Sequence, residues 1–167
     1  MARPPARYRA YNLCHQRVED EVPWLRLADL KEAEPLLPRP IVLCNGAFDL
    51  LHLGHMRLLF AAHNHGATVI VGLDSNRKVK ALKGEGRPVQ SWQRRATTLN
   101  YMPVDAVVEI DTDEDFKTLV RTIKPDLRVL SSEYLGHRSR IRSVPVLYVQ
   151  DRGDHTSDLI SRLGGLA

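Results

Sequence analysis

Compact apolar runs alternate along the chain with longer segments whose apolar residues recur at helical spacing. A short apolar run closed by turn residues predicts a buried strand, and the longer periodic segments predict helices. We expect strands within residues 39–48, 67–75, 105–110, 126–132 and 144–151, and helices within 24–37, 55–66, 91–102, 113–124 and 155–163. Such alternation is typical of a parallel sheet with helices on both faces. The pattern therefore predicts an α/β fold, a Rossmann-like doubly wound parallel sheet in a single domain.

Proline, glycine and serine mark the ends of several of these helices. Pro35 and Pro38 are expected to end the helix within residues 24–37, because proline cannot donate a backbone hydrogen bond. Gly66 is expected to cap the next helix, and Ser91 is a favourable N-cap for the helix that follows it.

The first residues differ from the rest in composition. The segment MARPPARYR is basic and contains two prolines, and no apolar core follows it as it would in a secretory signal. We predict that residues 1–24 form a basic, flexible extension and that residues 25–167 form the folded domain.

Composition narrows the class of protein. The chain has 167 residues, 43% hydrophobic and 26% charged, which is the usual balance of a globular domain. No apolar stretch approaches the ~20 residues that span a bilayer. Cys14 and Cys44 are the only cysteines, and Cys44 lies in an apolar run, so we expect a buried thiol and a cytoplasmic location. The net charge of +4 favours an anionic ligand, and phosphorylated metabolites, nucleotides and nucleic acid all stay open.

The segment NGAFDLLHLGH, residues 45–55, carries the chemistry. It follows the first predicted strand, where a helix start offers N–H groups and a partial positive charge to phosphate. Gly46 lets the backbone approach a ligand, Gly54 leaves room beside the helix start, and His52 and His55 can reach the same region. Alternatively, the histidines serve only as cap and packing. A zinc site is disfavoured, because Cys44 alternates away from the pair and no further ligands are suitably spaced.

This segment resembles the signature of the HxGH nucleotidyltransferases, the cytidylyltransferase-like superfamily. The later blocks follow in order over about residues 25–163: GLDSNRKVKALKGEGRPVQSWQRR, VDAVVEI, IKPDLRVL and RGDHTSDLI. Together they resemble the adenylyltransferase domain of bifunctional ADP-heptose synthases. The resemblance implies that residues 25–167 form a nucleotidyltransferase domain.

The resemblance also implies roles for individual residues. His52 and His55 match the histidines that bind the triphosphate and stabilise the transition state, and Lys83 matches a lysine on a flexible loop that reaches the phosphates. Arg95 matches an arginine that opens the following helix, and a catalytic role is expected for it as for His52, His55 and Lys83. Arg87 matches an arginine of the lysine's block. The expected nucleotide-binding residues are Asn45, Gly46, Ala47, Phe48, Gly54, Asp74, Thr156 and Ser157. Asp49 is expected in the site with an unassigned role.

Each assignment has a plainer alternative. Lys83, Arg87 and Arg95 could belong to a solvated basic face, the commoner position of a single Lys or Arg. Thr156 and Ser157 could cap the last predicted helix, a role compatible with phosphate binding because both use the same N–H groups. Without the motif, the solvated face is the preferred reading for the three cations.

One segment departs from the pattern. Where the heptose enzymes show a K-G-G-D-Y run, this chain has LSSEY, residues 130–134, followed by LGHRSRIR. A lysine and two glycines are lost, and glutamate, Glu133, replaces aspartate. Arg138, Arg140 and Arg142 could contact a phosphate-bearing acceptor, although an exposed basic loop is the preferred interpretation of each.

The expected reaction joins the NMP part of an NTP to a phosphorylated small molecule and releases pyrophosphate. ATP with a sugar 1-phosphate is the first choice, and CTP with a polyol phosphate such as glycerol 3-phosphate is the alternative. Mg²⁺ is the expected cofactor, held by the triphosphate without direct protein ligands. A non-catalytic nucleotide-binding module is a rival from another class. Membrane and nucleic-acid partners are disfavoured, and a homodimer is left open.

Overall fold

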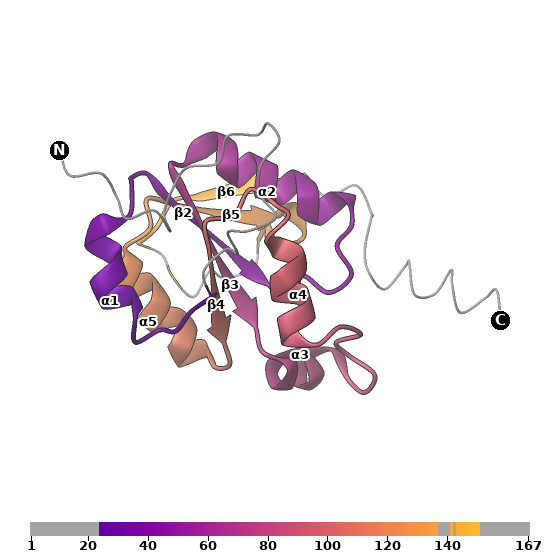
Figure 1. Cartoon of the computed structure of the whole chain (residues 1–167). Helices are drawn as coiled ribbons and strands as arrows, with labels where there is room; N and C mark the ends of the chain where they lie inside the picture. Colours follow the sequence, from indigo (N-terminus) through magenta and orange to yellow (C-terminus); the bar gives the residue numbers. More distant parts are fainter. Residues whose placement is uncertain (1–23, 137–140, 142, 151–167) are drawn as a thin grey trace.

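The protein is described by a computed structural model over residues 24–136, 141 and 143–150 (Figure 1). Arg138, Arg140, Arg142, Thr156, Ser157, the helix expected over 155–163 and residues 1–23 of the extension lie outside the described residues. The elements in chain order are β1 (Trp24–Leu25), α1 (Leu30–Ala33), η2 (Glu34–Leu36), β2 (Ile41–Gly46), α2 (Leu53–His65), β3 (Thr68–Asp74), α3 (Asn76–Lys83), α4 (Trp92–Leu99), β4 (Ala106–Ile110), α5 (Asp113–Ile123), β5 (Leu127–Ser131), η3 (Ser132–Tyr134) and β6 (Val146–Val149).

One sheet of six strands forms the centre of the fold. Its order is β1-β4-β3-β2-β5-β6, and every neighbouring pair is parallel. From β2 the chain adds β3 and β4 on one side and then returns to add β5 and β6 on the other. The predicted Rossmann-like α/β fold is therefore confirmed. The strand order reverses between β2 and β5, and in open α/β sheets a ligand binds beyond the carboxyl ends of the strands at such a switch point.

Helices cover both faces of the sheet, with α2 and α4 on one face and α1 and α5 on the other (Figure 1). The alternation of side chains along β2 supplies both cores, because successive residues of a strand point to opposite faces. Val42 and Cys44 pack in the core below α2 and α4, whereas Ile41 and Leu43 pack in the core below α1 and α5. Cys44 is fully buried, as predicted, and this burial raises the pKa of its thiol to about 12.

The helix ends show which boundary signals were informative. Ser75, Ser91 and Thr112 cap α3, α4 and α5, each accepting a hydrogen bond from a backbone N–H three residues later. Gly66 ends α2 as expected, but its φ of −136° is extended rather than left-handed. Glycine is needed there for space, because an added Cβ would lie 2.5 Å from Val42 Cγ2.

The structure differs from three expectations about the elements in detail. The short helix expected within residues 24–37 is present as α1, but it covers only Leu30–Ala33, because Trp24 and Leu25 pair with β4 and Pro35 lies in the 3-10 turn η2 that follows α1. Helix α2 begins at Leu53, two residues before the predicted start. Lys83 is the last residue of α3 and does not lie on a loop, and the sequence pattern does not indicate this helix.

No helix among the described residues is long and apolar enough to cross a membrane.

Candidate active site

The connection from β2 to α2 is a tight, strained loop. Phe48 and Leu50 have φ values of 46° and 54°, a left-handed conformation that is uncommon for large side chains. Strain of this kind persists only where surrounding contacts hold it, and it clusters at functional sites. The contacts here come from Asp49, which lies between the two strained residues.

Asp49 ties this loop to the segment before α4. It is 1% exposed, and its carboxylate accepts hydrogen bonds from the backbone N–H groups of Val89 and Gln90 at 2.9 and 3.0 Å. Arg87 Nε donates to the same carboxylate at 3.2 Å, and the Arg87 side chain is only 12% exposed. Arg87 is thus not part of a solvated basic face, and the contact described for it is with the loop.

Arg95 holds the same region in place through hydrogen bonds. It is fully buried, and its guanidinium donates four hydrogen bonds. The acceptors are the backbone oxygens of Gln90, Ala47 and Asp74 and the side-chain oxygen of Asn76, at 2.6–3.2 Å. Burial lowers the pKa of this guanidinium. Since these acceptors follow β2, end β3, begin α3 and precede α4, Arg95 joins four segments, and the alternative of a solvated cation is wrong.

The two motif histidines stand at the start of α2. His52 is the N-cap, and its Nδ1 accepts a hydrogen bond of 3.2 Å from the backbone N–H of Gly54. An accepting Nδ1 carries no proton, so the ring proton of neutral His52 lies on Nε2, which is therefore a donor. The ring centroids of His52 and His55 are 3.8 Å apart, and the ring of Phe48 lies 5.1 Å from that of His55. Both histidines are half-buried.

A cavity of about 730 Å³ lies at the carboxyl ends of the strands, around the switch point. Five of the predicted residues line it, namely Asn45, Gly46, Ala47, Asp74 and Lys83. The other described candidates are not among its lining residues: Phe48, Asp49, His52, Gly54, His55, Arg87, Arg95 and Glu133. Asn45 to Ala47 thus connect the cavity to the loop that leads to the histidines.

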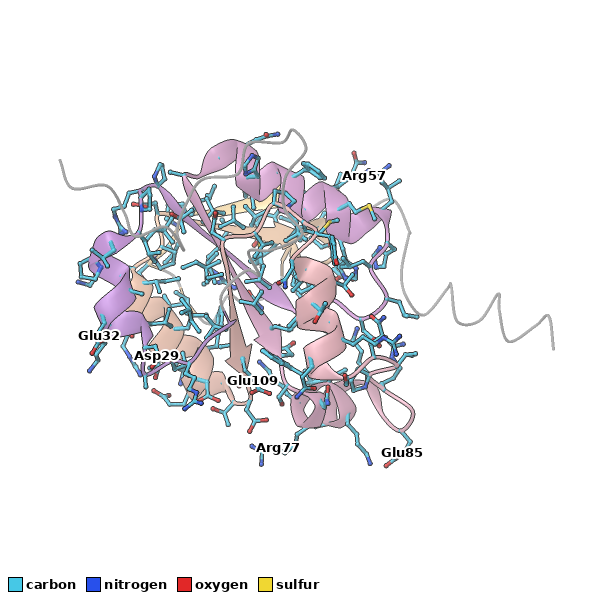
Figure 2. The ribbon with its side chains drawn as sticks, in the orientation of Figure 1. Asp29, Glu32, Arg57, Arg77, Glu85 and Glu109 are labelled. Atoms are coloured by element: carbon cyan, nitrogen blue, oxygen red, sulfur yellow. The ribbon has the colours of Figure 1, made fainter. Side chains whose placement is uncertain are left out.

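The charged groups that line the cavity are mostly paired. Lys78 Nζ lies 2.7 Å from Asp74 Oδ1, and Arg77 pairs with Asp111. Figure 2 shows Arg77 at the end of the sheet where β3 and β4 stop. Lys83 is exposed and, within the part of the chain that the structure describes, forms no ion pair. It is therefore a candidate to meet an anion.

Several lining residues were missed in the sequence. Phe116, Arg128, Tyr134 and Tyr148 also face the cavity. Arg128 could have been found, because an arginine inside the apolar run DLRVL is unusual for a buried strand. Glu133 is exposed, whereas its neighbour Tyr134 contributes to the cavity.

No three potential metal ligands cluster among the described residues, so no protein cage for a metal ion is indicated there. Carboxylates do line the cavity at Asp74, Asp111 and Asp113.

The cavity lies at the switch point, and the N-terminus of α2 follows the loop beside it. In α/β domains, both places are suited to a phosphate-bearing ligand. The family model described as cytidylyltransferase-like matches residues 43–144. The chain belongs to this family of nucleotidyltransferases.

Comparison with individual proteins agrees with this family. The chain is 37% identical over 132 residues to the bifunctional protein HldE of Campylobacter fetus, and 38% identical over 137 residues to that of Helicobacter pylori. These matches cover 76% and 80% of this chain but only 28% and 30% of the relatives. The resemblance to the adenylyltransferase domain of these bifunctional proteins is confirmed, and the chain spans less than a third of their length.

Solved structures share the fold at low sequence identity. A pantoate-beta-alanine ligase from Francisella tularensis superposes with a TM-score of 0.58 at 12% identity, covering 83% of this chain and 73% of the ligase. A lipopolysaccharide core biosynthesis protein from Thermoplasma volcanium superposes with a TM-score of 0.51 at 20% identity, covering 66% of this chain and 93% of that protein. These similarities support the fold alone.

Proposed function

We propose that this chain transfers the nucleoside monophosphate part of an NTP to a phosphorylated small molecule and releases pyrophosphate. ATP and a sugar 1-phosphate are the substrates that we favour, since the relatives with 37–38% identity are bifunctional HldE proteins. CTP with a polyol phosphate is the alternative within the same family.

The observation that carries the proposal is the hydrogen bond from Gly54 N–H to His52 Nδ1. This bond leaves the opposite nitrogen, Nε2–H, as the donor of His52. At a helix start next to the switch point, such a donor suits a phosphate oxygen, and the helix dipole adds to the attraction. The hydrogen bond that makes His52 the N-cap therefore also sets the tautomer in which its Nε2–H can donate to a phosphate.

In the proposed step, an oxygen of the acceptor phosphate attacks the α-phosphorus of the NTP. A new P–O bond forms, the bond from the α-phosphorus to the α–β bridging oxygen breaks, and pyrophosphate leaves with the negative charge. The acceptor oxygen is already anionic, so no strong base is required. The protein aligns the two phosphates and stabilises the charge that develops. We assign this stabilisation to His52 and His55, with Lys83 closing on the phosphates from the end of α3.

We further propose that Mg²⁺ enters with the nucleotide. Oxygen ligands are those it prefers, and it usually keeps several waters and few protein ligands. When bound, it would neutralise part of the triphosphate charge. Of the described residues, the carboxylate of Asp74 lines the cavity and could contribute a ligand only by loosening its pair with Lys78.

Replacing His52 tests the proposal, and two variants separate its two roles. His52→Asn keeps a good N-cap, whereas His52→Ala removes both the cap and the imidazole. Both are expected to lower the rate of pyrophosphate release by roughly 10²- to 10³-fold, the usual cost of losing one oxyanion donor. Only His52→Ala should also lower stability, by about 1 kcal/mol. His65→Ala, in the last turn of the same helix, is the matched control.

The assay follows pyrophosphate with ATP or CTP and a panel of phosphorylated acceptors. Wild-type turnover in His52→Asn would contradict the role given to the imidazole. Nucleotide binding without pyrophosphate release from any acceptor would instead favour the non-catalytic module.

A further inference from the structure

Arg128 is a buried cation in the wall of the cavity. It lies in β5, pairs in register with Leu43 of β2, and is 5% exposed. Its guanidinium carbon lies 5.1 Å from the ring centroid of Phe116 in α5, and its Nη2 donates to Asn45 Oδ1 at 3.1 Å. Arg128 therefore spans the switch point from β5 to the end of β2, where the loop towards His52 begins.

The place of Arg128 in β5 links it to the departure LSSEY. Leu130 begins that segment, and both Arg128 and Leu130 line the cavity, whereas Val129 between them packs in the opposite core. The two cavity-lining residues therefore share one face of the strand. The lysine of the K-G-G-D-Y run is lost at the start of the segment, and a cation stands two residues earlier on the same face.

A guanidinium in this position is suited to an anion. Burial lowers the pKa of Arg128, which reflects the cost of holding a charge away from water. An anionic group in the cavity would offset that cost, and the planar guanidinium can bind a carboxylate or phosphate through two hydrogen bonds. Stacking on Phe116 and the bond to Asn45 hold the guanidinium in one orientation.

The anion that Arg128 meets and the triphosphate of the proposed reaction are assigned to different parts of the site. Of the residues assigned to the reacting phosphates, Lys83 lines this cavity, whereas His52 and His55 do not. Lys83 ends the helix that follows β3, and Arg128 lies in β5, on the other side of β2. The cavity extends from Asn45 to Ala47, next to the loop, across to Arg128 and Tyr148. A ligand whose phosphate reacts beside the loop would reach Arg128 with its other end.

We propose that Arg128 binds a second anionic group of the acceptor, a carboxylate or a phosphate at the end remote from the reacting phosphate. Arg128 is then a specificity-determining residue, and the substrate class narrows to phosphorylated small molecules that carry two negative groups. This inference rests on the proposed function for the identity of the ligand as an acceptor.

Acceptors that differ in one group test this assignment. Glucose 1-phosphate and glucuronic acid 1-phosphate differ only in a hydroxymethyl or a carboxylate group, and glucose 1,6-bisphosphate places a phosphate there. We expect the two compounds with a second anionic group to bind the wild-type chain at least about 10-fold more tightly than glucose 1-phosphate in calorimetric titrations, as for a charge-assisted contact. Pyrophosphate release should show the same order of kcat/KM.

Variants of Arg128 provide the decisive comparison. In Arg128→Leu, the affinity for the compounds with a second anionic group relative to that for glucose 1-phosphate should fall to about one. Arg128→Lys keeps the charge and should keep part of this preference. Arg121→Leu removes an exposed arginine of α5 and should leave the ratio unchanged. Thermal unfolding of each variant checks the fold, and if Arg128→Leu does not fold, the comparison is made with Arg128→Lys.

The outcomes separate this inference from the proposed function. Equal affinity of the wild-type chain for all three acceptors overturns the role of Arg128. The same affinity ratio in Arg128→Leu as in the wild type overturns it as well. Weaker binding of ATP alone in Arg128→Leu also overturns it, because the contact would then be with the nucleotide. A preference for the compounds with a second anionic group that depends on Arg128, without pyrophosphate release, supports the inference and refutes the transfer reaction.

Discussion

The charged side chains expected in the site separate into two regions with opposite properties. At the start of α2 and the end of α3, His52, His55 and Lys83 are half-buried or exposed. Around the loop between β2 and α2, Asp49 and Arg95 are buried, and their polar atoms are used by the protein itself. The first region is the one to which we assign the phosphates, whereas the second holds the loop that leads to it.

The difference shows how a charged residue near a site can act on the substrate or on the loops around it. Arginine has five N–H donors in a rigid plane, so one buried side chain can join several backbone oxygens. Arg95 does this with four acceptors. The catalytic role expected for Arg95 is therefore best proposed as positioning, since its described contacts are with protein groups.

Replacing Arg95 should have the largest effect on stability. Arg95→Leu leaves the buried backbone oxygen of Asp74 and the partly buried ones of Ala47 and Gln90 without this donor, and leaving a buried acceptor unpaired typically costs about 1–3 kcal/mol. We expect the free energy of unfolding to fall by about 3–5 kcal/mol in urea titrations, and pyrophosphate release to be lost as the loops move. Arg95→Lys should rescue little, because one ammonium cannot reach four acceptors.

The neighbouring arginine provides the matched control for this variant. Arg94 lies on the exposed side of α4, and Arg94→Leu should change stability by less than about 0.5 kcal/mol. A stable Arg95→Leu variant with strongly reduced nucleotide affinity would instead show that Arg95 acts on the ligand, as proposed for His52 and Lys83.

Lys83 should show the opposite behaviour, an effect on activity without an effect on stability. Lys83→Ala removes one donor that could meet a phosphate, and a hydrogen bond to a charged group is worth about 1.5–3 kcal/mol. We expect kcat/KM for pyrophosphate release to fall roughly 10- to 100-fold while the Tm stays constant. Lys80→Ala removes a lysine of the same helix that pairs with Glu85 at the surface, and it should leave kcat/KM unchanged. Equal losses in the two variants would place Lys83 on an ordinary solvated surface.

The sequence predicted the fold well because its signal is periodic. The strands from β2 to β6 and the helices α2, α4 and α5 lie where apolar spacing and capping residues indicate them. The helix α3 was missed because NRKVKALK buries only Val79 and shows no apolar stripe. The two residues of β1 are strand only because they pair with Val107 and Val108, and no local pattern encodes such pairing.

The candidate site was predictable in its residues but not in their division of labour. The motif led to Asp49, His52 and Arg95 alike, because all three belong to one resemblance. Which of them faces a ligand depends on burial and on acceptors far away in the chain, such as Ala47 for Arg95. Gly66 illustrates the same limit, since its contact with Val42 cannot be read from the end of a helix.

The pair of Arg77 and Asp111 lies between the two regions, because it lines the cavity but is a protein contact at the surface. Hydrogen bonds from Arg77 and then from Ser75 hold the pKa of the Asp111 carboxyl below its ordinary value. A lowered pKa in the folded state contributes stability above the unfolded value of about 3.9, and that contribution is lost as the pH falls through the folded value. Asp111→Asn should therefore lower the Tm slightly at pH 7, with the difference from the wild type closing below about pH 4.

The effect of Asp111→Asn should be the smallest of the series, since exposed ion pairs contribute little. Glu32→Gln, on the exposed side of α1, is the control and should leave the Tm unchanged at both pH values. Thermal unfolding with added ATP shows whether the pair acts as a protein contact, like Arg95, or contacts the ligand, like Lys83. If added ATP protects the wild type and Asp111→Asn equally against thermal unfolding, Asp111 serves only to hold Arg77 and the start of α3. If protection by ATP increases in the variant, Arg77 has been released to the ligand, and the boundary between the two regions lies at this residue.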